Sequence, residues 1–111
     1  MPETKTEWLN RVANMHGLDP EDIEEVAEIC LEDSKVCLET LQNAKDGDDL
    51  ENAVRAAHSL KGSATNVGLD ALSAVSKVVE SALKQNDFSD YSAQVANVAT
   101  ELSAFENMLN S

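Results

Sequence analysis

One histidine stands among residues that could support covalent chemistry. His58 is followed by Lys61 and Gly62, and a second glycine, Gly68, lies six positions further on. In a helix, residues three and four apart share a face, so a cation and a position without a side chain would lie beside the imidazole. An unperturbed imidazole titrates near neutrality and offers a neutral nucleophile at cellular pH. Attack by a ring nitrogen on a phosphoryl group would give a phosphoramidate, which can pass the group on.

The neighbours of His58 suggest separate contributions to such a transfer. Lys61 would stabilise negative charge on the phosphoryl oxygens, although a solvated lysine that balances an acidic chain is the ordinary alternative. Gly62 costs about 1 kcal/mol relative to alanine inside a helix, so its presence needs a reason. Its expected position lies about 40° from His58 on the open side, which favours room for a partner over close packing. Arg55 and Thr65 are expected on the same face.

The spacing of the histidine, the Lys-Gly pair and the second glycine resembles the signature of histidine-containing phosphotransfer (HPt) domains. The resemblance covers about residues 20–110. It implies that His58 is the phosphoacceptor, with Lys61 and Gly62 beside it, and that the ring nitrogen distal to the backbone carries the phosphoryl group. Glu80 falls near the position at which some members hydrogen-bond the other ring nitrogen, where a carboxylate could fix the tautomer. An exposed helix carboxylate outside the site is an equally open interpretation.

The same resemblance implies a function and its partners. HPt domains shuttle phosphoryl groups between the aspartates of receiver domains, so the expected partners are response-regulator receiver domains and a hybrid sensor histidine kinase. The sequence contains no glycine-rich phosphate-binding loop, no ATP-binding motif and no carboxylate cluster suited to Mg²⁺. We therefore expect a phosphoryl carrier with no kinase activity, metal site or cofactor of its own, whose receiver partner supplies Mg²⁺.

Two alternatives to a phosphorelay carrier stay open. The chain also resembles the amino-terminal phosphoacceptor domain of a chemotaxis-like histidine kinase, which carries a similar run around its histidine. The start at Met1 and a helix that ends near Ser111 favour a free-standing protein over such a domain. The other alternative is a helical adaptor that never carries phosphate. A metal-binding bundle is disfavoured, because two distant histidines and two distant cysteines provide no converging ligand set.

Signals for helix starts and ends divide the chain into five helices. The expected breaks and caps are Gly17, Asp19-Pro20, Asp46-Gly47, Asp48 with Glu51 as its capping-box partner, Gly68 and Ser89. We expect an all-α protein, with an antiparallel up-down four-helix bundle over about residues 19–110. A short additional N-terminal helix, over about residues 6–16 and anchored by Trp8, should cover one end. Residues 1–111 are expected to form a single HPt domain.

The helix that carries His58 has a continuous apolar stripe. At 100° per residue, one of its faces collects a set of apolar side chains, namely Leu50, Ala53, Ala57, Leu60, Ala64 and Val67. His58 lies about 140° from the centre of this stripe, on the exposed side. We expect a partner to dock across the third and fourth helices around His58, with Val54 and Val67 as apolar residues at the border.

The chain is strongly acidic, and its charge is unevenly distributed. The net charge of −13 argues against nucleic acid as a partner. Residues 52–86 carry a net charge of +2 and the remainder carries −15, so the least acidic segment contains His58. No apolar run reaches the roughly 18 to 20 residues that span a bilayer. We expect a monomeric, cytoplasmic protein without membrane association, in which Cys30 and Cys37 are free, buried thiols.

Overall fold

Five helices make up most of the chain in the computed structural model, which describes residues 3–44 and 49–111. In chain order the helices are α1 (Lys5–His16), α2 (Pro20–Asn43), α3 (Leu50–Asn66), α4 (Asp70–Lys84) and α5 (Tyr91–Leu109). The described residues contain no strand. The all-α class expected from the sequence is confirmed, and the ends of α1 lie within one residue of the expected bounds.

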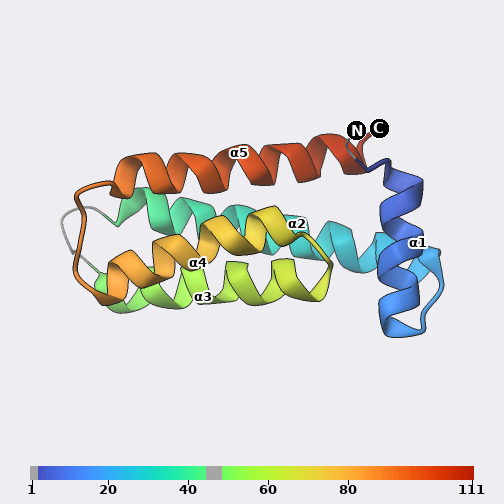
Figure 1. Cartoon of the computed structure of the whole chain (residues 1–111), viewed down its shortest axis with the longest axis horizontal. Coiled ribbons are helices and arrows are strands. Elements are labelled where there is room, and N and C mark those ends of the chain that lie inside the picture. Colours follow the sequence, from blue (N-terminus) through green and yellow to red (C-terminus); the bar gives the residue numbers. More distant parts are fainter. Residues whose placement is uncertain (1–2, 45–48) are drawn as a thin grey trace.

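The four longer helices form an antiparallel bundle. Successive helices from α2 to α5 run in alternating directions, and α1 lies across one end (Figure 1). Each bundle helix packs against two others, because α3 contacts α2 and α4, and α5 contacts the same two helices from the other side. The short turns between successive helices enforce this up-down order. α3 therefore lies between α2 and α4, which are the two helices that can approach the surroundings of His58.

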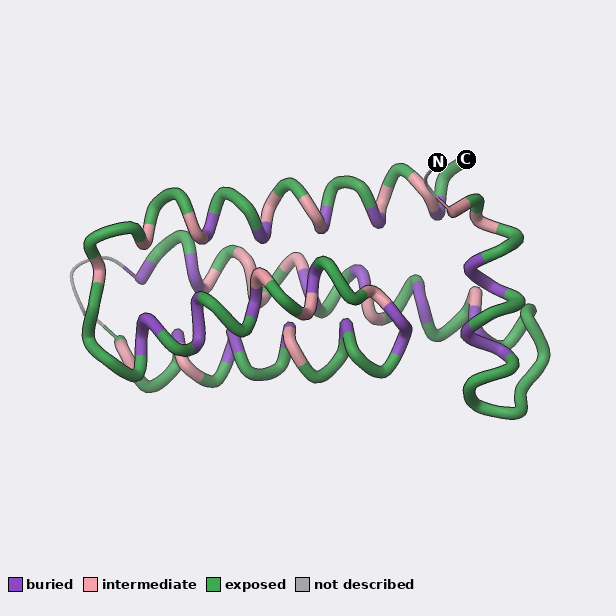
Figure 2. The backbone as a smooth tube through the Cα atoms, in the orientation of Figure 1, coloured by how far each residue is buried: buried purple, intermediate pink, exposed green. Residues whose placement is uncertain are grey.

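The core occupies the space between the bundle helices. Buried positions point inward along every helix, while outward positions are exposed (Figure 2). On α3 the buried residues reproduce the expected stripe, with Leu50 half-buried and the others buried, namely Ala53, Ala57, Leu60, Ala64 and Val67. Burying this stripe contributes hydrophobic free energy and fixes the rotation of α3 about its axis. His58 is consequently held on the outer side of the helix.

Of two helix starts expected from the sequence, one is confirmed and the other is wrong. α2 begins as expected, with Asp19 as the N-cap residue and Pro20 at the first helical position. The cap expected at Ser89 is wrong, because Asp90 is the residue that precedes α5. The Ser89 hydroxyl instead donates to the Asp87 Oδ1 at 2.6 Å. Serine was a reasonable cap candidate, but the chain takes a local turn around Asp87 before the helix begins.

The start of α3 lies next to residues that the structure does not describe. Asp49 precedes the helix and has a left-handed backbone, with φ of 55°. The break expected at Asp46-Gly47 and the cap expected at Asp48 lie outside the described residues. Glu51, the expected capping-box partner, is in the first turn of α3 and accepts a hydrogen bond from Arg55.

The end of α3 is closed by a glycine in the left-handed conformation. Gly68 has a φ of +67°, which a residue with a side chain rarely adopts. The Leu69 N–H donates to the Ala64 carbonyl at 2.8 Å and the Gly68 N–H donates to the Thr65 carbonyl at 3.2 Å, which is the Schellman pattern. A Cβ at Gly68 would also lie 2.7 Å from the Arg11 Nη1 atom. The left-handed turn therefore favours glycine here, and a Cβ would in addition make the Arg11 side chain shift.

α1 closes the same end of the bundle by contacting the last carbonyl of α3 and the two carbonyls that follow it. The Trp8 Nε1–H donates to the Val67 carbonyl and the Arg11 Nη2 donates to the Gly68 carbonyl, each at 2.9 Å. The His16 Nε2 lies 2.6 Å from the Asn66 carbonyl. At the end of α1, the His16 ring thus contacts a carbonyl of α3 and not one of its own helix. These contacts satisfy groups that a helix end leaves without intrahelical partners.

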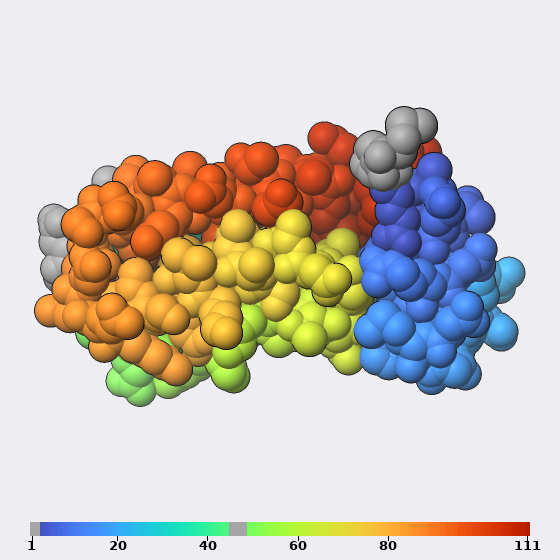
Figure 3. Space-filling model, viewed as in Figure 1, coloured from blue at the N-terminus to red at the C-terminus, as the bar shows by residue number. Residues whose placement is uncertain are grey.

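Trp8 is the anchor of α1, as the sequence predicted. Its side chain is buried and its ring meets Phe105 of α5 edge-on, with 5.6 Å between ring centroids. The space-filling view shows α1 packed closely against the end of the bundle (Figure 3). The aromatic ring thus fills the end of the core while its N–H satisfies the carbonyl of Val67, just after α3. Val67 is buried beneath this helix, with 3% of its surface exposed, so it cannot border a docking surface as expected.

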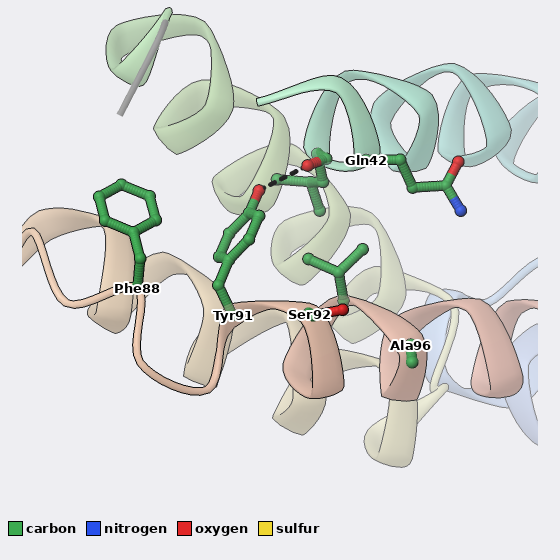
Figure 4. Close-up of a pocket in the computed structure, with 7 residues that line it drawn as sticks. Gln42, Phe88, Tyr91, Ser92 and Ala96 are labelled. Atoms are coloured by element: carbon green, nitrogen blue, oxygen red, sulfur yellow. Dashed lines mark hydrogen bonds between the residues drawn. The ribbon is translucent and has the colours of Figure 1, made fainter. Parts of the chain in front are cut away.

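The opposite end of the bundle is tied by a tyrosine. The Tyr91 hydroxyl, at the start of α5, donates to the Leu41 carbonyl of α2 at 2.6 Å (Figure 4). A pocket lies beside this bond between the two helices, and its lining includes Gln42, Phe88 and Ala96 but no residue of the His58 surroundings. Further along the same pair of helices, Lys35 and Glu106 form an ion pair.

Several expectations about single side chains are corrected. Met15 of α1 and Val26 of α2 lie at apolar positions of the helical repeat, yet they are 53% and 44% exposed. Cys30 and Cys37 are free thiols as expected, but they are half-buried, and burial raises the pKa of each. No group of side chains suited to hold a metal ion occurs in residues 3–44 and 49–111. Within those ranges, no helix combines the length and apolar character needed to cross a membrane.

We predict that the Trp8 N–H stabilises the packing of α1 on the bundle. Trp8→Phe keeps an aromatic ring but leaves the buried Val67 carbonyl without its donor, so the free energy of unfolding should fall by about 1 to 3 kcal/mol. Denaturant unfolding followed by circular dichroism measures this change. Met15→Ala, on an exposed position of the same helix, should stay within about 0.5 kcal/mol of the parent. Equal stability of the two variants would contradict the assigned role of the hydrogen bond.

Candidate functional site

His58 projects from the outer face of α3 into solvent. Its side chain is 66% exposed, although the helix beneath it is packed on two sides. The exposure follows from the helical period, since the buried stripe of α3 lies on the opposite side. A partner macromolecule can therefore reach the imidazole without any rearrangement of the bundle.

A buried carboxylate from α4 holds one nitrogen of the imidazole. The Glu80 Oε2 lies 2.8 Å from the His58 Nδ1, and the Glu80 side chain is only 6% exposed. An ionised carboxylate can only accept hydrogen bonds, so the ring must donate through its Nδ1–H. A neutral imidazole with this proton has an unprotonated Nε2. The nitrogen distal to the backbone is thus the available nucleophile.

Two ammonium groups surround the same carboxylate. The Lys61 Nζ donates to the Glu80 Oε1 at 2.9 Å, and the Lys84 Nζ lies 3.3 Å from Oε2. Burial alone would raise the pKa of Glu80, but hydrogen bonds from Lys61, His58 and Lys84 outweigh it and lower the pKa to about 2. Glu80 is therefore an anion across the physiological pH range, and it remains an acceptor for the Nδ1–H.

The four side chains meet because two local spacings face each other across the α3–α4 contact. Lys61 follows His58 by three residues and Lys84 follows Glu80 by four, so each pair lies on one face of its helix. α3 and α4 are antiparallel and in direct contact, which brings the two pairs together. Lys84 is the site residue that the sequence analysis missed. The Glu-to-Lys spacing of four was the available signal, because this order favours ion pairs on helices.

Gly62 leaves an open space beside the imidazole. It is exposed, and a Cβ built at this position would meet no atom within 4 Å. Its backbone is helical, without the positive φ of Gly17 and Gly68. Neither packing nor backbone conformation within the described chain therefore requires glycine here, although glycine destabilises a helix interior by about 1 kcal/mol.

Two residues expected on this face are engaged elsewhere. The Arg55 guanidinium turns toward the preceding turn of α3, where it donates to the Glu51 Oε1 at 3.1 Å. The Thr65 hydroxyl donates to the Lys61 carbonyl at 2.8 Å and lies 2.7 Å from the Ser73 hydroxyl of α4. Thr65 therefore helps to join α3 to α4, and neither residue shares the hydrogen bonds of His58.

A family model described as Hpt domain matches residues 25–109, which include His58, Glu80 and the two lysines that contact Glu80. α1 lies before the matched range. No match was found among curated proteins or among solved structures.

We predict a specific acid sensitivity from Glu80. Because its pKa in the folded protein, about 2, lies below the ordinary value of 4.5, its contribution to stability is complete above about pH 4.5 and is lost as the pH falls toward 2. Glu80→Gln should lower the free energy of unfolding by about 1 to 3 kcal/mol near pH 5, and the difference from the parent should shrink toward pH 2.

Denaturant titrations between about pH 2 and pH 5 measure this difference. Glu51→Gln is the matched control, because Glu51 forms a salt bridge with Arg55 but its side chain is 86% exposed. That variant should stay within about 0.5 kcal/mol of the parent at every pH. A constant gap between the parent and Glu80→Gln across the range would refute the ionised, hydrogen-bonded state of Glu80.

Proposed function

The chain belongs to the Hpt family, whose members transfer phosphoryl groups in phosphorelays, and we propose that His58 is its phosphoacceptor. In this proposal the Nε2 attacks the phosphorus of a receiver aspartyl phosphate. A P–N bond forms as the P–O bond to the aspartate breaks. The reverse exchange, on the aspartate of another receiver domain, returns the imidazole to its starting state.

The observation that best supports this role is the contact between Glu80 and the Nδ1 of His58. It holds the ring in the tautomer whose Nε2 lone pair faces solvent, so orientation and protonation suit in-line attack. As the P–N bond forms, positive charge develops on the ring. The carboxylate at 2.8 Å stabilises that charge, and its own proton affinity is too low for it to remove the Nδ1 proton.

Lys61 is proposed to act on the phosphoryl oxygens. Its ammonium lies on the same side of α3 as the imidazole, and its side chain is 31% exposed. Rotation of the lysine side chain would let one N–H contact an incoming phosphoryl oxygen while Glu80 keeps its other donors. The chain then supplies one cation to the transferring group, and the receiver domain supplies the Mg²⁺ and the aspartate.

We propose that a receiver domain approaches His58 from the α2 side of α3. The apolar side chains of Ile29 and Val36 on α2 are 62% and 65% exposed and lie seven residues apart on one face. Val36 lines a groove with Ser59 and Ser63 of α3, so small residues separate it from the histidine. Val67 is buried and leaves the border expected from the sequence, whereas the half-buried Val54 stays in it beside these residues. Apolar contacts near a reactive site favour a small, transient interface.

The remaining elements of the proposal concern the context of the site. α1 forms one domain with the bundle, because Trp8 and Arg11 hydrogen-bond the end of α3. The chain works as a monomer in the cytoplasm, the usual setting of Hpt proteins. The same chemistry at His58 would serve a carrier in a relay with a hybrid kinase or a phosphoacceptor module of a chemotaxis-like kinase.

We predict that His58 is the phosphorylated residue. The parent should take up an acid-labile, base-stable label from a phosphorylated receiver domain, and His58→Gln should take up none while its helical circular dichroism persists. His16→Gln serves as the control, because His16 is the other histidine and lies at the end of α1. Label retained in the His58 variant would overturn the proposed function and favour an adaptor that never carries phosphate.

We predict that Gly62 serves the approach of the receiver and not the stability of the bundle. Gly62→Ala should leave stability unchanged or raise it by up to about 1 kcal/mol, since its Cβ meets no neighbour. Gly62→Gln should slow transfer from a receiver at least about tenfold, through obstruction of the imidazole, which corresponds to about 1.4 kcal/mol. Phosphorylation by the small donor phosphoramidate should change little. A strongly lowered melting temperature with normal receiver transfer would show that Gly62 is a packing residue.

A further inference from the structure

The Glu80 carboxylate carries one negative charge but contacts two ammonium groups. Lys61 contacts one oxygen at 2.9 Å, and Lys84 contacts the other at 3.3 Å. That second oxygen is also the acceptor for the His58 Nδ1. We propose that Lys84 is a positioning residue that holds His58 in its neutral, Nδ1-protonated form by sharing the oxygen to which the ring donates. The biological meaning of this role rests on the proposed function, whereas its physical test does not.

The need for a second cation follows from what a carboxylate does to an imidazole. An anion next to the ring favours the doubly protonated imidazolium. In that form both nitrogens carry protons, and Nε2 has no lone pair for attack on phosphorus. Glu80 therefore orients the ring but also favours its protonated form. Lys61 and Lys84 together give the cluster a net charge of +1 around a neutral ring, so their ammonium groups offset the attraction of the carboxylate for a further proton.

The position of Lys84 makes its effect larger than that of an ordinary surface lysine. Exposed ion pairs four residues apart on a helix are usually weak, and Lys84 itself is 60% exposed. Its partner differs from that case, because the Glu80 side chain is only 6% exposed and sits between two packed helices. Water screens the shared oxygen poorly, so the field of the Lys84 ammonium reaches the Nδ1 through one intervening atom.

Other charges near the site do not replace Lys84. Arg55 of α3 is paired with Glu51 in the turn before His58. On α2, Asp33 lies across the groove beside Ser59, where an anion would favour protonation of the ring instead of opposing it. On α4, Lys77 is exposed two turns before Lys84 and on the same face. Lys77 thus provides a matched control for loss of one positive charge.

The direct test is a titration of the His58 ring followed by ¹⁵N NMR in the full chain. Lys84→Met should raise the pH at which half of the ring is protonated, by several tenths of a unit to about one unit. Lys84→Arg should restore the parent titration, and Lys77→Met should leave it unchanged. A titration of Lys84→Met equal to that of Lys77→Met would overturn the proposal.

A second measurement separates positioning from general disruption of the site. Phosphoramidate transfers its phosphoryl group to an imidazole: a bond forms between phosphorus and Nε2, the P–N bond of the donor breaks, and ammonia leaves with a proton. Below the ring's titration midpoint, Lys84→Met should react about two- to tenfold more slowly than the parent, following the shift above. At high pH, where the ring is neutral in both proteins, the two rates should agree.

The outcomes distinguish the two proposals. A Lys84→Met rate that is equally low at all pH values would mean that Lys84 maintains the structure of the site, and would overturn its role in ring protonation. If the ring titration shifts as expected but no phosphoryl group is accepted by the parent from any donor, the Lys84 role stands and the phosphoacceptor role of His58 fails.

Discussion

The rest of the site depends on one buried anion. A carboxylate that is 6% exposed would be expelled from the interior or neutralised unless cations and hydrogen-bond donors compensate it. Here the compensation comes from His58 and Lys61 on α3 and from Lys84 on the helix of Glu80 itself. The same contacts that make the buried charge tolerable fix the tautomer of the imidazole. The contact between α3 and α4 and the free lone pair of the Nε2 therefore depend on the same cluster.

That cluster needs a helix whose rotation and end are fixed. The apolar stripe of α3 sets its rotation, since the alanines and Leu60 must face the core. The end of the helix is closed by the turn at Gly68 and by Trp8 and Arg11 of α1, which lie on successive carbonyls. Gly62 is the exception to this pattern, because it weakens the helix without serving a contact. Local preference and global fold conflict at this one position, as is typical of residues kept for a partner.

The exposed faces of the molecule divide in a way that fits transient recognition. The charged cluster around Glu80 lies on the α4 side of His58, whereas the α2 side carries the exposed side chains of Ile29 and Val36 together with Asp33. In the proposed docking, a receiver domain meets Ile29 and Val36 next to an open imidazole, with the charged cluster on the other side of the ring. Such an arrangement would provide contact area for docking without burying the ion cluster. The groups that fix the tautomer of the ring would then keep their contacts during recognition.

The sequence alone determined the features that depend on distances of a few residues. Five helices, their all-α class and the exposed position of His58 follow from apolar periodicity, glycines and prolines, because helix geometry fixes which residues share a face. The placement of Lys61 and Gly62 beside the histidine is local in the same sense. Only the tertiary structure decided which side chains meet across helices. Glu80 lies 22 residues from His58 and could have been a solvated carboxylate, Arg55 and Thr65 bond other groups, and Val67 is covered by α1. The helical period fixes the direction in which each side chain leaves its helix. Which residue that side chain meets is decided by how the helices pack, and this packing depends on the whole core.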